Sequence, residues 1–346
     1  MGKSQAGGAA TLKDVARLAK VHPATVSRAL DPAKADLVHP DTRERIVRVA
    51  NDVGYRINAF AQSLRKNVSG MVGVVVADVA NPFLPPVLRG IEQVLRAEGR
   101  LLLIAETHDD SATLASILEH LVTRRVDAII LSAAHRDDAD VVRAILPLIP
   151  VVLAVRSLES DAFPTVTHDD VLGGKLAARH LVELGHQSLA QLAGPADISS
   201  FNGRSTGFGS VMATTSARDV SVEDYAAEPT VAEGYRLTRQ LLDRGTDRPT
   251  ALFAHNDQLA VGALDALREH GLRCPEDVSI VGYNDAPLTD HLDPPLTTVR
   301  LPGIDLGRRA AELALQQIAG DAAGTQIERF PPELVVRRST APPATG

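Results

Sequence analysis

The sequence predicts an all-α N-terminal domain followed by a larger α/β body made of two lobes. A chain of 346 residues is too long for one ordinary domain and suggests two or three. Capping residues and apolar spacing indicate three short helices in the first 55 residues. From Met71 onward, short apolar runs alternate with amphipathic stretches, which is typical of parallel sheets covered by helices on both faces.

Composition excludes several classes of protein. With 45% hydrophobic and 23% charged residues, the chain is typical of a soluble globular protein. The longest apolar runs, Met71–Ala77 and Ala144–Val155, are short or interrupted by proline, so we expect no membrane span. The first fifteen residues lack the apolar core of a secretory signal, and Cys274 is the single cysteine. We therefore expect a cytoplasmic protein without a disulfide, a cofactor or a metal cluster.

Charge is divided unevenly along the chain. The net charge is −7, but residues 1–70 hold 12 Lys and Arg against 6 Asp and Glu. The head therefore carries a net charge of +6 and the rest a net charge of −13. A basic head on an acidic body suggests that the head binds a polyanion. The alternative is chance unevenness in a short window.

Two short helices joined by a turn open the head. The hydroxyl of Thr11 can accept from the amide of Asp14, which starts a helix and brings an acidic residue into its first turn. Lys20–His22 form the turn, and Pro23 suits the first position of the next helix, Pro23–Leu30. A third helix spans about residues 42–53 and ends at a glycine.

This arrangement is a helix-turn-helix, whose second helix enters the major groove of DNA with its N-terminal residues toward the bases. Arg28 can pair with guanine, and Ala24 can contact a thymine methyl group. Thr25 and Ser27 are placed to meet phosphates. The alternative is an ordinary three-helix bundle with a solvated basic face. The candidate DNA-binding residues of the head are Thr11, Pro23, Ala24, Thr25, Ser27 and Arg28.

Two segments, TLKDVARLAKVHPATVSRAL and TRERIVRVANDVGYRINAFAQSLR, closely resemble the head of the lactose repressor (LacI/GalR) family. The resemblance is specific over residues 11–65 and looser to about residue 340. The sequence departs from the family at His22, where many relatives carry a serine cap, and in a slightly longer stretch at Pro32–Leu37. Imidazole is a poorer cap than a hydroxyl, so we expect a less rigid helix start.

The resemblance implies a periplasmic-binding-protein type of body and a division into functional parts. Residues 1–57 would be the DNA-binding domain, 58–69 the hinge helix or linker, and 70–346 the effector-binding and dimerisation domain. Within that domain we expect lobes at about 71–168 and 170–298, both completed by 299–340.

The hinge segment reads NAFAQSL from Asn58 to Leu64. In the family it becomes helical only on operator DNA, which agrees with the cost of nucleating so short a helix. By resemblance, Leu64 would wedge into the central base step in the minor groove, with Asn58, Ala61 and Arg65 also at the DNA. The alternative for Leu64 is packing of a linker against the body.

In the body, the expected strands are 71–77, 101–105, 128–131, 151–155, 189–193, 251–254 and 278–282. The expected helices are 84–97, 112–123, 173–184, 231–244, 258–270 and 303–318. Ligands of open α/β sheets bind beyond the carboxyl ends of the strands, and a cleft between lobes is a favoured site. Residues that follow these strands are therefore the candidates for an effector site.

Each candidate has a structural alternative. Asp78 and Phe83 follow the first strand, and Phe83 is either a stacking face for a sugar or plain core. A polar loop is expected from Gly194 to Arg204, and Arg204 resembles the arginine that holds sugar hydroxyls in the family, unless it forms a surface salt bridge. Two further pairs, Asn256-Asp257 and Asn284-Asp285, follow later strands, although both could cap helices or turns. Asp257 in particular suits a cap.

Two departures bear on the ligand. Many relatives carry aspartate where Asn284 and Val155 stand, so the pocket is expected to be less acidic. Arg156, the remaining effector candidate, and Arg204 would then be less compensated. The hypothesis that follows is an acidic or phosphorylated sugar as the effector.

The resemblance implies a ligand-responsive transcriptional regulator. We expect a repressor that binds a pseudo-palindromic operator on double-stranded DNA and is released by a sugar, sugar acid or sugar phosphate through a population shift. No heptad-bearing tail follows Arg338, so a homodimer is favoured over a tetramer.

Three rivals remain. An esterase is suggested by Gly203-Arg204-Ser205-Thr206-Gly207, which matches the G-x-S-x-G pattern but lies some nine residues after the nearest expected strand. The segments His108–Asp110 and His168–Asp170 suggest metal ligands, although turn residues explain them better. A free sugar-transport protein conflicts with the basic head and the absent signal.

Overall fold

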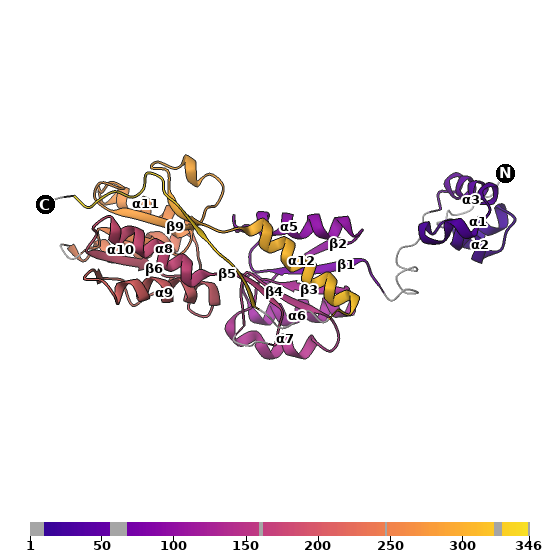
Figure 1. The fold of residues 1–346 in the computed structure, drawn as a ribbon, viewed down its shortest axis with the longest axis horizontal. Helices are drawn as coiled ribbons and strands as arrows, with labels where there is room; N and C mark the ends of the chain where they lie inside the picture. Colours follow the sequence, from indigo (N-terminus) through magenta and orange to yellow (C-terminus); the bar gives the residue numbers. More distant parts are fainter. Residues whose placement is uncertain (1–9, 56–67, 159–161, 246–247, 322–326, 345–346) are drawn as a thin grey trace, which may run out of the picture. The chain divides into compact units, whose positions relative to one another are not determined.

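A computed structural model describes residues 10–55, 68–158, 162–245, 248–321 and 327–344. The chain divides into two compact units, Met1–Ser69 and Gly70–Gly346, and each is described by itself (Figure 1). Among the described residues no helix is long and apolar enough to cross a bilayer.

The N-terminal unit consists of helices. They are α1 (Leu12–Leu18), α2 (Pro23–Ala29), the 3₁₀ helix η1 (Pro32–Leu37) and α3 (Pro40–Asp52). Their inward faces form one small core, which includes Val15, Val26 and Ile46. The predicted helix-turn-helix is confirmed, and α3 begins two residues earlier than expected because a proline occupies its first turn.

Helices α1 and α2 each begin with a capping side chain. Asp14 N donates to Thr11 Oγ1 at 3.3 Å, while Thr11 N donates to Asp14 Oδ2 at 3.1 Å, which completes a capping box. His22 also caps its helix, since Ala24 N donates to His22 Nδ1 at 3.2 Å. The imidazole therefore performs the task that the sequence led us to expect it to perform poorly.

The body contains two six-stranded sheets. The first has the order β11-β5-β4-β3-β1-β2 and the second the order β12-β10-β9-β8-β6-β7. All pairs are parallel except β10 with β12. The strands of the first sheet are β1 (Met71–Val76), β2 (Leu101–Glu106), β3 (Ala128–Leu131), β4 (Val151–Ala154), β5 (Thr165–His168) and β11 (Ile327–Phe330). Those of the second are β6 (Ser188–Leu192), β7 (Arg218–Asp219), β8 (Ala251–Ala254), β9 (Ser279–Asn284), β10 (Thr297–Arg300) and β12 (Glu333–Val335).

Helices cover both faces of each sheet. The first sheet has α5 (Leu84–Ala97) and α12 (Gly303–Ala319) on one face and α6 (Ser111–Thr123) and α7 (Ala139–Ile145) on the other. The second has α10 (Val231–Leu242) and α11 (Asp257–Glu269) opposite α8 (Asp170–Glu183) and α9 (Ser199–Met212). In β1, Val74 and Val76 face the α5 side and Val75 faces the α6 side, as alternation along a strand requires. The predicted α/β class is confirmed.

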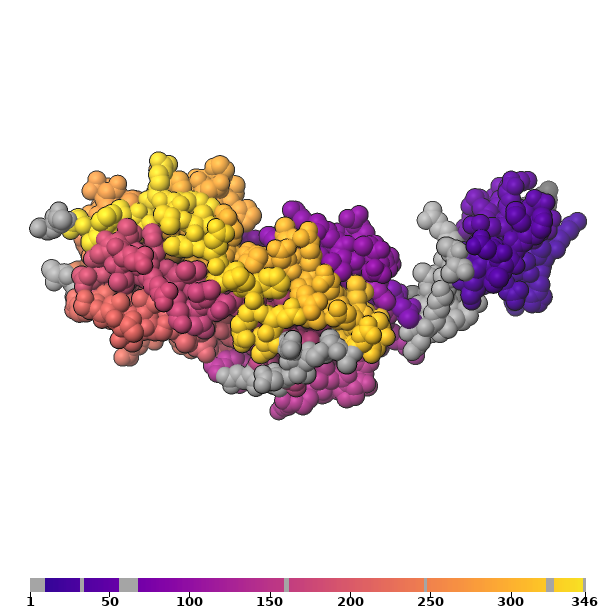
Figure 2. Space-filling model, viewed as in Figure 1, coloured from indigo at the N-terminus to yellow at the C-terminus, as the bar shows by residue number. Residues whose placement is uncertain are grey.

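We call each sheet with its helices a lobe. The chain passes between the lobes after β5, after β10, and again between β11 and β12 (Figure 1). The segment after residue 300 lies on the surface of both lobes (Figure 2). Strand-end residues of the two sheets therefore meet where the lobes join.

Every predicted strand and helix of the body is present, with ends shifted by a few residues. The prediction of a polar loop from Gly194 to Arg204 is wrong, because α9 begins at Ser199. Its glycines and hydroxyl residues have low helix propensity and show no clear apolar stripe, so packing against α8 and the second sheet accounts for the helix.

Candidate DNA-recognition surface and effector site

Helix α2 has one buried face and one open face. Val26 and Ala29 are buried, whereas Ala24 and Arg28, four residues apart, are exposed. Pro23, Thr25 and Ser27 are half-buried beside them, and Thr11 is exposed at the start of α1 with its hydroxyl donating to Asp14. Within the described part of the chain, the guanidinium of Arg28 makes no hydrogen bond or ion pair, whereas its backbone carbonyl has partners. An unpaired cation on an open helix face is suited to an external anion.

The four hinge candidates, Asn58, Ala61, Leu64 and Arg65, lie outside the described residues. Their roles at DNA, and the wedge at Leu64, stay predictions.

Arg204 lies inside the second lobe, on α9, and is 5% exposed. Its Nε donates to Asp170 Oδ1 at 2.9 Å, and its Nη1 donates to the carbonyl of His255. The guanidinium carbon lies 3.9 Å from the ring centre of Tyr283, whose hydroxyl donates to Asp170 Oδ1 at 3.0 Å. The alternative of a surface salt bridge is wrong, because the pair is buried.

Glycines bring Arg204 and Asp170 together. A Cβ on Gly174 of α8 would lie 2.2 Å from the carbonyl oxygen of Arg204, and one on Gly207 would lie 2.1 Å from the carbonyl oxygen of Val171. Helices α8 and α9 can therefore approach closely only with glycine at these positions. The second glycine of the G-x-S-x-G pattern serves this packing. Ser205 lies in mid-helix, without the strand-to-helix turn that a nucleophile requires.

Arg156 follows β4 in the first lobe, is itself buried, and has a half-buried carboxylate partner. Its Nη1 and Nη2 donate to the two oxygens of Asp109 at 2.6 and 3.3 Å. Burial would raise the pKa of Asp109, but hydrogen bonds from His135 and Arg156 outweigh it and hold that pKa well below its usual range. Both arginines are thus compensated by carboxylates, which corrects the premise that led us to an acidic or phosphorylated effector.

The segment before α5 meets the end of β5 at an aromatic contact. Phe83 precedes α5 and packs against the cores of both lobes, and its ring meets that of His168 edge-on at 5.5 Å. Burial, with a further contribution from Arg204, lowers the pKa of His168 to about 3, so the imidazole is neutral. Its Nε2 is buried and has no hydrogen-bond partner within the described chain.

Asn284 presents a second unpartnered atom, its buried Oδ1. With Phe83 it lines a cavity of about 300 Å³ between Pro82–Pro86, Asn284–Pro287 and Arg300–Asp305. Buried polar atoms nearly always have partners, and an orphan often marks the place of a missing ligand. A hydrogen-bonding ligand at this junction would satisfy such atoms.

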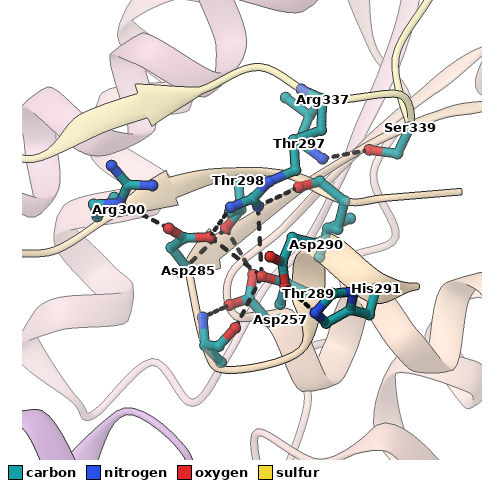
Figure 3. Close-up of polar contacts among 12 residues, drawn as sticks. Asp257, Asp285, Thr289, Asp290, His291, Thr297, Thr298, Arg300, Arg337 and Ser339 are labelled. Carbon is teal, nitrogen blue, oxygen red and sulfur yellow. Dashed lines mark hydrogen bonds and ion pairs between the residues drawn. The ribbon is translucent and has the colours of Figure 1, made fainter.

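The loop that carries Asn284 is strained, and ion pairs of the next residue, Asp285, with Arg300 and Arg337 hold it (Figure 3). Asn284, Asp285 and Leu288 have φ of 113°, 55° and 75°, in the region that side chains disfavour. Asp285 accepts from Arg337 Nη2 and from Arg300 Nε, each at 2.7 Å. Such strain persists only where surrounding contacts fix it, and it is common at ligand sites.

Asp257 supports the same loop. Its Oδ2 accepts from Ala286 N and its Oδ1 from the hydroxyl of Thr298, each at 2.7 Å (Figure 3). Burial raises the pKa of Asp257 to about 7. The cap of α11 comes instead from Asn256, whose Oδ1 accepts from Leu259 N and whose Nδ2 donates to the Pro229 carbonyl. Since both polar groups of Asn256 are engaged, the capping alternative describes it well.

Asp78 is exposed after β1, and its Oδ1 accepts from Ala80 N at 2.7 Å in a tight turn. The turn interpretation also fits two acidic residues of the suspected metal motifs. Asp110 accepts from Thr113 N and Asp169 from Leu172 N, so both cap helices. Across the described ranges, no three His, Cys, Asp or Glu side chains are placed to hold a metal ion.

Sequence reasoning missed several residues near the junction: His135, His168 as the ring partner of Phe83, Asp170 as the partner of Arg204, Asp197 and Tyr283. His168 and Tyr283 lie at the ends of β5 and β9, so the strand-end rule would have found His168 had β5 been predicted. The carboxylate partners carry no local signal, because ion pairs between distant residues depend on the fold.

A helix-turn-helix head joined to a two-lobed α/β body defines a class of non-enzymatic, ligand-responsive transcriptional regulators. Residues 11–58 match the family model of bacterial regulatory proteins of the lacI family, and residues 178–340 match the periplasmic binding protein-like domain. The chain belongs to the lacI family.

Relatives match along nearly the whole chain. The HTH-type transcriptional repressor CytR of Escherichia coli (strain K12) is 34% identical over 334 residues, which cover 96% of each chain. The structure of the Lac repressor dimer bound to operator and an anti-inducer superposes with a TM-score of 0.85 at 28% identity, covering 96% of this chain and 100% of that one. The transcriptional regulator CelR in complex with cellobiose has a TM-score of 0.71 at 30% identity, covering 95% and 99%.

Proposed function

We propose that this protein is a repressor that binds a pseudo-palindromic operator as a homodimer and is released by a neutral sugar. The observation that carries the DNA half of the proposal is the open face of α2. There Ala24 and Arg28 stand exposed above a buried core, and the guanidinium of Arg28 lacks a partner within the described residues. The hinge residues 58–69 would add the minor-groove contact. Such a regulator would act in the cytoplasm, where the chromosome lies.

The effector half rests on the junction of the lobes. Phe83 and Asn284 line its cavity, and the unpartnered Oδ1 of Asn284 would accept from a hydroxyl group there. The unpartnered Nε2 of His168 belongs to the ring that packs against Phe83. Arg156 and Arg204 already face carboxylates, which favours a neutral ligand over an anion. A similar regulator solved with cellobiose supports the sugar class.

The homodimer is supported by an edge strand. Strand β2 ends the first sheet, and its Leu101 and Ile104 are 69% and 43% exposed. Exposed apolar edge strands invite pairing, and monomers usually blunt them. A two-fold partner across this edge would cover them and would set two heads at two half-sites.

Three measurements test the proposal. Selection from genomic fragments should yield a symmetric site whose affinity falls steeply with added salt, because phosphate contacts release counterions. A thermal-shift screen should find a neutral sugar that raises the melting temperature more than its acid or phosphate forms. Leu101→Asp should yield monomers by analytical ultracentrifugation and weaken operator binding. Failure to retain any fragment, with or without sugars, would overturn the repressor function.

A further inference from the structure

One histidine joins the two lobes with both of its ring nitrogens. His135 follows β3 in the first lobe, and its Nε2 lies 2.8 Å from Asp109 Oδ1 of the same lobe. Its Nδ1 lies 2.7 Å from Asp197 Oδ2, in the segment between β6 and α9 of the second lobe. A carboxylate can only accept, so the ring must donate from both nitrogens and is an imidazolium.

Among the ion-paired groups at this ring, the charges cancel only when the ring is protonated. Asp109 and Asp197 contribute two negative charges, and Arg156 contributes one positive charge on the other side of Asp109. The hydrogen bond to Asp109, against the cost of burial and with help from Asp197, raises the pKa of His135 to about 9. Three further groups lie nearby: Asp138, which accepts from His135 N at 2.8 Å, Asp110, and Arg136.

Strained backbone in the turn after β2 positions the carboxylate of Asp109. His108 and Asp109 both have positive φ, of 53° and 57°, in the turn after β2. Two consecutive side-chain-bearing residues in this region cost free energy, and the contacts of Asp109 to His135 and Arg156 account for the turn.

Two backbone amides also donate hydrogen bonds from one lobe to the other, and we call this region of contact the seam. Arg136 N donates to the carbonyl of Asp197 at 3.1 Å, and Ser157 N donates to Ser199 Oγ at 2.8 Å. Ser199 is the first residue of α9, the helix that carries Arg204. The seam therefore connects the residue next to Arg156 with the helix of Arg204.

We propose that His135 is a positioning residue of the effector site, whose charged ring holds the two lobes together and fixes Asp109 against Arg156. We call the contacts of His135 with Asp109 and Asp197 the clasp. The importance of His135 for ligand release rests on the proposed function, whereas the clasp itself does not. Ligand exchange requires the lobes to part, so the His135–Asp197 bond must break on opening. The clasp thus favours the closed cleft and weakens as the pH rises through the pKa of the ring.

Hydrogen exchange of the two seam amides tests the clasp without any ligand. In the full chain at pH 7, we expect His135→Gln to speed exchange of the Arg136 and Ser157 amides roughly tenfold, because a bond between full charges is lost. Asp197→Asn should have the same effect, and the double variant should add little. His120→Gln, an exposed histidine on α6, is the matched control and should leave both amides unchanged.

The parent protein gives a second measurement that needs no variant. After correction for intrinsic exchange, seam protection should fall between pH 8 and 10 while that of Ile129 and Ile130 in β3 stays constant. Nitrogen chemical shifts should show a doubly protonated His135 that titrates near pH 9. Seam amides indifferent to pH and to both substitutions, or a ring that titrates near its ordinary pKa, would overturn the clasp. A protein that binds no sugar but shows the seam effects would instead refute the effector proposal alone.

Discussion

The recognition helix and the effector junction use arginine in opposite ways. Arg28 stands exposed on α2, and its guanidinium has no partner in the described part of the chain. Arg204 is buried between an aspartate, a tyrosine ring and a carbonyl oxygen, and Arg156 shares a carboxylate with a histidine. The difference shows where the anion that pairs with each arginine comes from. DNA brings phosphates from outside, whereas the cleft contains its own carboxylates and can fix its donors before a ligand arrives.

The largest effect is expected from removing the carboxylate that pairs with the buried Arg204. Asp170→Ala should lower the free energy of unfolding by about 3–5 kcal/mol, because it leaves a buried guanidinium without its carboxylate. Asp140→Ala breaks an exposed pair with Arg143 and should change it by less than about 0.5 kcal/mol. Urea unfolding measures both. Equal losses would mean that Arg204 is hydrated in solution.

Substitution of the exposed Arg28 should instead weaken DNA binding and leave the stability of the fold unchanged. Arg28→Ala should cost about 1–3 kcal/mol of binding at one base pair and relax specificity there, with unchanged stability. Arg48→Ala, on the exposed side of α3, removes a similar charge and should leave specificity unaltered. Binding to a set of operators with single substitutions measures the effect. A parent and an Arg28 variant with identical sequence preference would exclude Arg28 as a reader of bases.

A smaller effect is expected from the neutral histidine of the junction. The folded pKa of His168, about 3, lies below the ordinary 6.5, so its contribution to stability is complete above pH 6.5 and is lost as the pH falls toward 3. Between pH 7 and 5.5 this loss is about 1 kcal/mol. His168→Phe should flatten this part of the stability curve in denaturant titrations. His120→Phe is the matched control, and an unflattened curve for His168→Phe would contradict the burial argument.

The smallest expected effect concerns the cap of α2. His22→Ser should raise the stability of the head by a few tenths of a kcal/mol, because a hydroxyl caps better than an imidazole. Thermal unfolding of the head, followed by circular dichroism, measures the change. A clear loss of stability would show that the imidazole makes further contacts.

Local signals predicted the regular elements, whereas tertiary packing decided the rest. Helix α5 carries a clear apolar stripe, and its predicted ends match the observed Leu84–Ala97. Helix α9 lacks such a stripe and contains Gly203 and Gly207, so its helical state depends on α8. Strand β5 is only Thr165–His168 and reads as polar, and therefore escaped prediction.

The candidate site divides in the same manner. Arg204 was identified through its resemblance and Phe83 through its place after a strand. Asp170, which pairs with the buried Arg204, lies 34 residues from it in sequence. The hypothesis of an acidic ligand came from counting two absent aspartates. Its premise left out Asp109 and Asp170, which lie beside Arg156 and Arg204.

The end of the described chain serves both lobes. Strand β11 closes one edge of the first sheet, and only two residues later β12 closes an edge of the second. Beyond them, Arg337 holds the loop of Asn284, and Ser339 Oγ donates to the carbonyl of Ile280. Proteolytic removal of the chain from β11 onward would therefore affect both lobes at once. Each sheet would lose an edge strand, and the strained loop would lose its contact with Arg337.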